Sequence, residues 1–193
     1  MGRYFIAVVP QGLNENPELK QLLGKMKRTL RDKEREVRWV HPDLWHVTLA
    51  FLGNLPPERH QELCDLLNGW MPLNAAEVVL RLHGIGAYPI EDQARVLWVG
   101  VGENQQFLNL QAELVSLLRA NDFELEDRPY HPHLTLARFR NSQSVADLVE
   151  LGGRKHFGDC AINELILFES VLQGNIVKYV PTLRRNLVAP ASS

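Results

Sequence analysis

The stretch His46-Val47-Thr48-Leu49 is repeated later in the chain as His133-Leu134-Thr135-Leu136. The chain holds seven histidines and four threonines in 193 residues, so chance would give only about 0.15 His-x-Thr pairs. Both copies lie in alternating apolar runs, and residues i and i+2 of a strand point to the same face. Each copy therefore predicts a strand with an imidazole and a hydroxyl on one face and two apolar side chains in the core.

A single His-x-Thr strand is more often structural than functional, but two at matching places favour a shared site. One imidazole can accept a proton from an attacking oxygen while the other donates one to the leaving oxygen. In-line displacement at phosphorus puts these oxygens on opposite sides, so histidines from two facing strands suit it. Thr48 and Thr135 would donate hydrogen bonds to the non-bridging oxygens, where negative charge resides. The pattern predicts phosphoryl chemistry without a metal.

The composition is that of a soluble globular protein, 45% hydrophobic and 23% charged. A net charge of −2 gives no overall field for long nucleic acid, so any RNA contact must be local. Cys64 and Cys160 are isolated thiols, and no signal peptide or membrane-spanning run is recognisable. We expect a cytoplasmic monomer that does not bind membranes.

The periodicity of apolar residues repeats one plan in both halves: strand, helix, His-x-Thr strand, helix, strand. The expected strands cover residues 3–9, 45–52, 77–82, 94–101, 131–139, 162–168 and 176–180. The expected helices are 17–33, one opened by Pro56, one capped by Asn104 and one capped by Ser142 or Ser144. Gly84-Ile85-Gly86 with Pro89 predicts a turn, and the short Gly-rich connections after Leu82 and Ser170 favour antiparallel hairpins.

A duplication explains this plan, and we expect an α+β fold. Two mainly antiparallel sheets face each other across a central cleft, with the helices outside. Residues 1–193 form one domain of two pseudo-symmetric lobes, with the His-x-Thr strands near 45–52 and 131–139.

Other phosphoryl chemistries lack their motifs. The chain has no GxxxxGK[ST] loop and no acidic cluster for two Mg²⁺ ions. A zinc site is the alternative, because His41, His46, His131 and His133 could converge. Without HExxH, paired cysteines or a carboxylate motif, we expect no metal and no cofactor.

The chain resembles the two-histidine (2H) phosphoesterase superfamily, and within it the RNA 2′,3′-cyclic phosphodiesterases, also known as 2′-5′ RNA ligases. The resemblance runs over nearly the whole chain and is carried by residues 3–7, Trp39-Val40, residues 46–53, 95–101 and 128–138, and Phe168-Glu169-Ser170. It implies a bilobal fold and hydrolysis of terminal 2′,3′-cyclic phosphates to 2′-phosphates without metal or ATP. The implied partners are RNA with such ends, tRNA halves among them, or small cyclic nucleotides. Some members also join tRNA halves through a reversible 2′-5′ linkage.

By position in the family motifs, the resemblance makes His46 the proton donor and His133 the proton acceptor that activates water. Arg138 resembles a family arginine that contacts the phosphate. Strand parity puts its side chain on the face of the strand away from His133 unless a bulge intervenes. An ordinary surface arginine is the alternative. Phe51 could stack on a base, or simply belong to the core. His131, at a variable position of the family, is expected at the edge of the cleft.

Seven of the 21 Lys and Arg side chains lie in one stretch, interleaved with Asp32, Glu34 and Glu36. A solvated helix face and an RNA-docking strip are both compatible with this pattern. The basic stretch comprises Lys25, Lys27, Arg28, Arg31, Lys33, Arg35 and Arg38.

Three functions compete with the expected one. Two are phosphodiesterases, acting on 2′-5′ linkages or on ADP-ribose cyclic phosphate. The third is a nucleotide-binding module without turnover, which the two intact His-x-Thr pairs disfavour.

Overall fold

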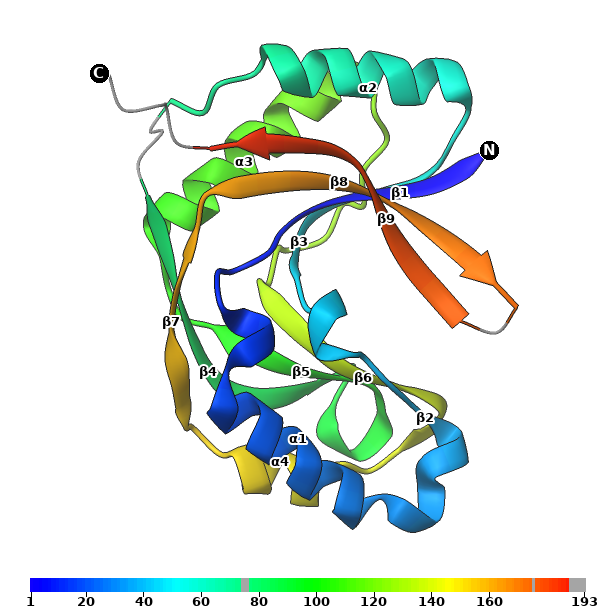
Figure 1. Ribbon diagram of the computed structural model, residues 1–193, viewed down its shortest axis with the longest axis vertical. Helices are drawn as coiled ribbons and strands as arrows, with labels where there is room; N and C mark the ends of the chain where they lie inside the picture. The colour runs from blue at the N-terminus through cyan, green and yellow to red at the C-terminus, as the bar shows by residue number, and fades with distance from the viewer. Residues whose placement is uncertain (74–76, 175, 188–193) are drawn as a thin grey trace.

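Both His-x-Thr segments form strands, and these lie next to each other in the middle of one antiparallel sheet (Figure 1). The structure is a computed structural model that describes residues 1–73, 77–174 and 176–187. In the described residues the strand order is β7-β4-β5-β6-β3-β1-β8-β9, with β2 paired to β6. The strands are β1 (Gly2–Val8), β2 (Val37–Trp39), β3 (Val47–Leu55), β4 (Val78–Tyr88), β5 (Ala94–Val101), β6 (His133–Gln143), β7 (His156–Ile162), β8 (Glu164–Gln173) and β9 (Ile176–Asn186).

The sheet has two halves that meet where β3 pairs with β6, at Val47 and Leu134. Beyond this contact β1, β8 and β9 follow on one side, and β5, β4 and β7 on the other. Helices α2 (Pro57–Gly69) and α3 (Gln105–Ala120) cover the β3 half, while α1 (Pro17–Thr29) and α4 (Ala146–Gly152) cover the β6 half (Figure 1). The predicted α+β class, antiparallel pairing and outer helices are confirmed, while the two predicted sheets are two halves of one sheet, joined by the β3–β6 pairing.

The apolar residues that alternate with the His and Thr side chains are buried, as predicted. Val47 and Leu134 are completely inaccessible, and Leu49 and Leu136 are at most 2% exposed. Burying an aliphatic side chain contributes about 1.5–3 kcal/mol. This burial fixes which face of each strand is left for the histidines.

The two halves of the sheet do not correspond to the two halves of the sequence, because helices and strands are exchanged between the two halves of the sheet. Helix α1 follows β1 in the chain but packs in the core of the β6 half, and α3 follows β5 but packs in the core of the β3 half. Strand β4 pairs with β5, and β8 pairs with β1. A strand can pair along only two edges, and both edges of β1 are occupied, by β3 and β8. Strand β4 therefore cannot pair with β1 and pairs with β5 in the other half of the sheet.

The predicted turn at Gly84-Ile85-Gly86 is wrong, because these residues lie within β4. Gly84 adopts φ +66° at an irregularity in the pairing with β5, a conformation that glycine adopts readily. The connection of the β4–β5 hairpin comes after Tyr88, where Pro89, the other residue of the predicted turn, does lie. Neither predicted serine caps α4, whose N-cap is Val145, while Ser144 donates to Asp92 Oδ1 at 3.1 Å.

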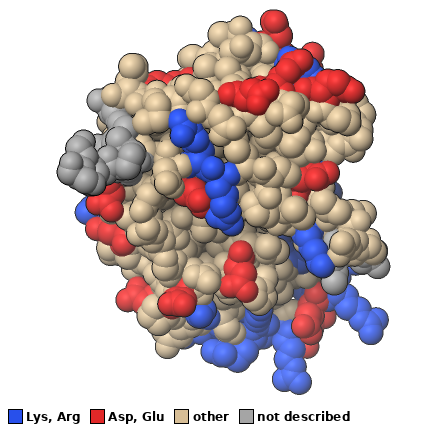
Figure 2. Space-filling model, turned by 45° about the horizontal axis from the view of Figure 1, so that its top comes forward, with Lys and Arg blue, Asp and Glu red and all other residues tan. Residues whose placement is uncertain are grey.

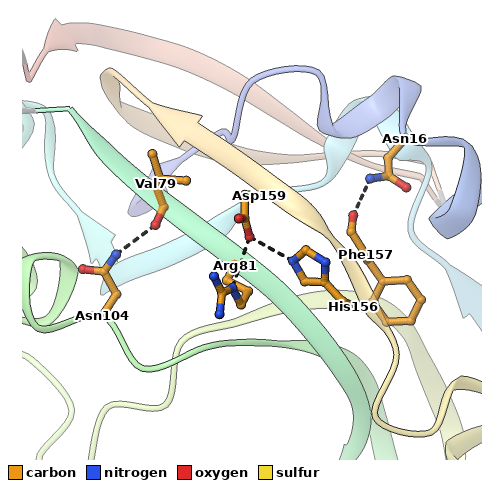
Figure 3. Close-up of polar contacts among 7 residues, drawn as sticks. All are labelled: Asn16, Val79, Arg81, Asn104, His156, Phe157 and Asp159. Carbon is orange, nitrogen blue, oxygen red and sulfur yellow. Dashed lines mark hydrogen bonds and ion pairs between the residues drawn. The ribbon is translucent and has the colours of Figure 1, made fainter.

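Two asparagines fasten the exchanged helices to the sheet (Figure 3). Asn104 caps α3 by accepting from the Phe107 N–H, as predicted, and its amide donates to Val79 O of β4 at 2.8 Å. Asn16 repeats this arrangement at α1, accepting from the Leu19 N–H and donating to Phe157 O of β7. Beside them Asp159 accepts from His156 and Arg81, across the β4–β7 pair.

Asn16→Ala and Asn104→Ala should each lower the free energy of unfolding by about 2 kcal/mol. The lost cap contributes about 1 kcal/mol and the lost hydrogen bond to the strand about 1 kcal/mol more. Urea denaturation measures this difference, with exposed Asn141→Ala as the control. A loss no larger than that of the control would contradict the dual role.

Within the described residues, no helix has both the length and the apolar character needed to cross a lipid bilayer.

Candidate active site

The pairing of β3 with β6 brings the two His-x-Thr motifs together. An antiparallel register through Val47 and Leu134 sets each histidine across from the threonine of the other strand. Residues two positions apart across such a pair are diagonal neighbours, about 7–8 Å apart between backbones. The four side chains share one face and are half-buried: His46, Thr48, His133 and Thr135.

Both imidazoles are oriented by the same local hydrogen bond. His46 Nδ1 lies 2.7 Å from Leu44 O, and His133 Nδ1 lies 2.8 Å from His131 O, in each case the carbonyl two residues earlier. A carbonyl can only accept, so Nδ1 carries the proton in both rings. In each neutral ring Nε2 is therefore left to accept or, once protonated, to donate a proton.

Aromatic rings surround His46 on the β3 half. Phe5 of β1 lies 5.0 Å from the imidazole between ring centroids, and Tyr179 of β9 meets it edge-on at 5.2 Å. Phe168 of β8 lies at 6.2 Å. These rings remove water from the imidazole.

His133 has an equivalent aromatic shell on the β6 half. Tyr88 meets its imidazole edge-on at 5.2 Å, and Trp98 lies at 6.1 Å between ring centroids. Trp98 rests on Gly86, where an added Cβ would come within 2.3 Å of the indole. Glycine at this position thus leaves room for the Trp98 indole beside His133.

Burial lowers the pKa of both histidines. Desolvation is the main cause at His46, where the pKa falls from 6.5 to about 4, and the nearby positive charges of Arg138 and His133 lower it further. Desolvation also lowers the pKa of His133, again with a contribution from Arg138. Both imidazoles are therefore neutral at pH 7 in the free protein, and a bound phosphate anion would favour protonation of one of them.

Arg138 lies on the same face as the histidines because β6 contains a bulge. Thr135 pairs with Trp98 and Ala137 with Leu97, so Leu136 is extra and the strand parity reverses after it. Residues 136 and 137 are both buried and Arg138 is exposed. Its positive charge contributes to lowering the pKa of both histidines.

Phe51 is placed on this face by the matching bulge in β3. Thr48 pairs with Ala7 and Ala50 with Ile6, so Leu49 is the extra residue. Phe51 is 41% exposed and lies 6.0 Å from Phe5 between ring centroids. It is therefore not a core side chain, and each histidine is followed five residues later by a group on the same face.

His131 lies in the segment before β6 and is exposed. Its carbonyl orients His133, and its own charge contributes to lowering the His133 pKa. The neighbouring Tyr130 was not predicted from the sequence. Its hydroxyl donates to Thr48 O at 2.8 Å and so fastens this segment to β3.

Among the described residues, the four histidines of the zinc alternative do not form one cluster of metal ligands. In the part of the chain that the structure describes, no three or more His, Cys, Asp or Glu side chains are arranged to hold a metal ion. The residues that do converge are two neutral imidazoles, two hydroxyls and a guanidinium. Such a set can move protons and hold an anion.

A family model described as LigT like Phosphoesterase matches the chain in two consecutive stretches, residues 13–98 and 99–179. An RNA 2′,3′-cyclic phosphodiesterase of Geobacillus stearothermophilus is 31% identical over 135 residues, or 70% of this chain and 41% of that protein. Another of that name, from Archaeoglobus fulgidus, is 29% identical over 174 residues, 88% of this chain and 92% of that protein.

The fold is also that of a solved structure. The crystal structure of E. coli LigT complexed with 3′-AMP is similar with a TM-score of 0.74 and 24% identity, over 97% of this chain and 99% of that one. The family model covers most of the chain, and its two stretches agree with the duplicated plan. The chain therefore belongs to the LigT-like phosphoesterase family, as its paired His-x-Thr motifs predicted.

Proposed function

We propose that the chain hydrolyses the 2′,3′-cyclic phosphate at RNA ends, or in small cyclic nucleotides, to a 2′-phosphate. The observation that carries the proposal is the pair of imidazoles on one face, each with Nδ1 bound to a carbonyl and Nε2 left for proton transfer. Family membership supports cyclic phosphodiesterase activity. The names of the relatives support RNA cyclic phosphate as the substrate.

In this mechanism a bound cyclic phosphate lies between the two histidines. Neutral His133 accepts the proton of the attacking water through Nε2, and protonated His46 donates from Nε2 to the leaving 3′ oxygen of the ribose. The P–O3′ bond breaks as the new P–O bond forms, and the 2′-phosphate remains. Because the two rings make the same local hydrogen bond, their geometry does not distinguish donor from acceptor. The assignment of the two roles therefore follows the family resemblance.

The other groups act on charge and on position. Thr48 and Thr135 donate hydrogen bonds to the non-bridging oxygens, and Arg138 balances their negative charge. Phe51 offers an exposed ring on which the terminal base can stack, and His131 lies at the edge of the site. If the 5′ hydroxyl of a second RNA strand replaces water as the nucleophile, the P–O3′ bond breaks in the same way and a 2′-5′ linkage forms, which is the ligation that the family resemblance implies. We treat residues 1–193 as one domain of two lobes.

The pH dependence follows from the two lowered pKa values. Turnover needs one neutral and one protonated imidazole, so kcat/KM falls when both carry a proton and when both have lost it. The pKa of His46 is lowered to about 4 and that of His133 is also lowered from 6.5, so we expect the maximum of kcat/KM on the acid side of 6.5. The maximum of kcat should lie at higher pH, because bound phosphate raises both pKa values. A pH–rate profile with 2′,3′-cyclic AMP tests this, and an alkaline maximum of kcat/KM would contradict it.

A comparison of three substrates tests the proposal against its alternatives. The purified protein is incubated with an RNA oligonucleotide ending in 2′,3′-cyclic phosphate, with a 2′-5′-linked dinucleotide and with ADP-ribose cyclic phosphate. We expect the first to have the highest kcat/KM. A preference for another would transfer the proposal to that substrate, and nucleotide binding without turnover would indicate a binding module.

A further inference from the structure

Strand β2 (Val37–Trp39) breaks the symmetry of the sheet. It pairs with β6 through residues 137–139, just beyond the point where β3 and β6 diverge. In the described part of the chain, no strand pairs with β3 at the equivalent place. The β6 side of the site therefore carries three residues that have no counterpart opposite.

The central residue of β2 adds a second guanidinium to the face of the histidines. Arg38 is the direct cross-strand partner of Arg138. Val37 is buried in the core and Trp39 packs against it, so Arg38 between them points to the opposite face. Both arginines are exposed on that face.

Two like charges directly opposite in an antiparallel pair repel each other. Neither guanidinium has a side-chain hydrogen bond or an ion pair within residues 1–73, 77–174 and 176–187. An anion between them would remove the repulsion, and paired guanidinium groups match the oxygens of a phosphate diester.

The rest of the basic stretch is placed differently. Helix α1 packs against the core side of the β6 half, opposite the histidines, and Lys27 lies over the Trp39 ring at 5.9 Å from its centroid. Residues Arg31–Glu36 form a short 3-10 helix with its acidic residues interleaved. Figure 2 shows Lys and Arg gathered at the lower end of the molecule, where these helices lie in Figure 1. Arg38 is thus the residue of the stretch that a paired strand places on the face of the histidines.

We propose that Arg38, together with Arg138, binds the phosphodiester that joins the terminal nucleotide to the rest of the RNA strand. This rests on the proposed function, and it makes the preferred substrate an oligonucleotide rather than a mononucleotide. The cyclic phosphate binds at the site formed by the two histidines and Arg138. The phosphodiester on the 5′ side of the terminal nucleotide lies between Arg38 and Arg138.

The test compares Arg38→Gln with the unmodified protein on two substrates. We expect kcat/KM for an oligonucleotide 2′,3′-cyclic phosphate to fall about 10-fold, the size of one charge-assisted hydrogen bond. With 2′,3′-cyclic AMP it should stay within about 2-fold of the original value, a small change of this kind being ordinary for an exposed side chain. For the oligonucleotide, the slope of log kcat/KM against the logarithm of the salt concentration should become less steep by about 0.7. This is the change expected when one contact to a phosphate of a single strand is lost. Arg35→Gln, in the 3-10 helix, is the matched control.

Each result decides the inference. An equal loss on both substrates would place Arg38 in the cyclic phosphate site, and no loss on either, or the same loss for Arg35→Gln, would show that it does not contact the strand. These outcomes contradict the inference while the proposed function stands. If the unmodified protein hydrolyses neither substrate, the proposed function itself fails. A melting temperature at least as high in Arg38→Gln shows that folding is not the cause, because the change removes a repulsion.

Discussion

His46→Ala and His133→Ala should each lower kcat/KM for a 2′,3′-cyclic phosphate by about 10²–10⁴, the usual contribution of a positioned acid or base. Each ring is fixed by a backbone carbonyl and shielded by aromatic side chains, so alanine leaves no group to take over the proton transfer. Because the rings act in the same step, the double variant should lose much less than the product of the two single losses.

Folding must be separated from chemistry in this experiment. His156→Ala, on the edge strand β7, removes an exposed histidine away from the pair and should leave the rate nearly unchanged. Circular dichroism and thermal melting confirm that each variant is folded. Undiminished hydrolysis in both folded variants would contradict the two-histidine mechanism.

The second large effect is expected at the threonines. Thr48→Val and Thr135→Val keep the shape of the side chain but remove the hydroxyl donor, and each should reduce kcat by about 10²–10³. The hydroxyls act on charge that develops as the P–O3′ bond breaks, so kcat should change far more than KM.

Thr29→Val provides the matched control, because its hydroxyl donates only within α1, to Lys25 O. Steady-state kinetics of the three variants with 2′,3′-cyclic AMP measure the effect. If KM rises while kcat stays constant, the threonines bind the ground state and transition state equally, and their proposed catalytic role is wrong.

Much of the fold could be predicted from local sequence. The alternation of Val47 and Leu49 with His46 and Thr48 fixes the buried face of the strand, and the same holds in the second copy. Asn104 marks a helix start through its own hydrogen bond, which involves residues only three positions apart. The duplication and the resemblance extended these local patterns to an α+β fold with two lobes.

Features that depend on pairing between distant segments were not predicted. The exchange of α1 and α3 between the lobes leaves no local signal, because either core accepts a similar apolar stripe. Strand β7 was missed, since Gly158 interrupts a short run of residues. Gly84 and Gly86 were read as a turn, although one serves an irregularity in β4 and the other the packing of Trp98.

The site shows the same division. The four motif residues follow from local parity, whereas the positions of Arg138 and Phe51 depend on bulges that the strand pairing establishes. Consecutive apolar residues at 49–50 and 136–137 are the available signal. Tyr130 and the aromatic shells of both histidines come from segments far apart in sequence, which single-sequence patterns do not connect.

The central claim is tested most directly by the identity of the product. An RNA oligonucleotide ending in a 2′,3′-cyclic phosphate is incubated with the purified protein in the presence of EDTA, and the position of the phosphate is mapped. The two-histidine mechanism, with His46 donating to the 3′ oxygen, predicts a 2′-phosphate at undiminished rate. A 3′-phosphate, or turnover that EDTA abolishes, would contradict it.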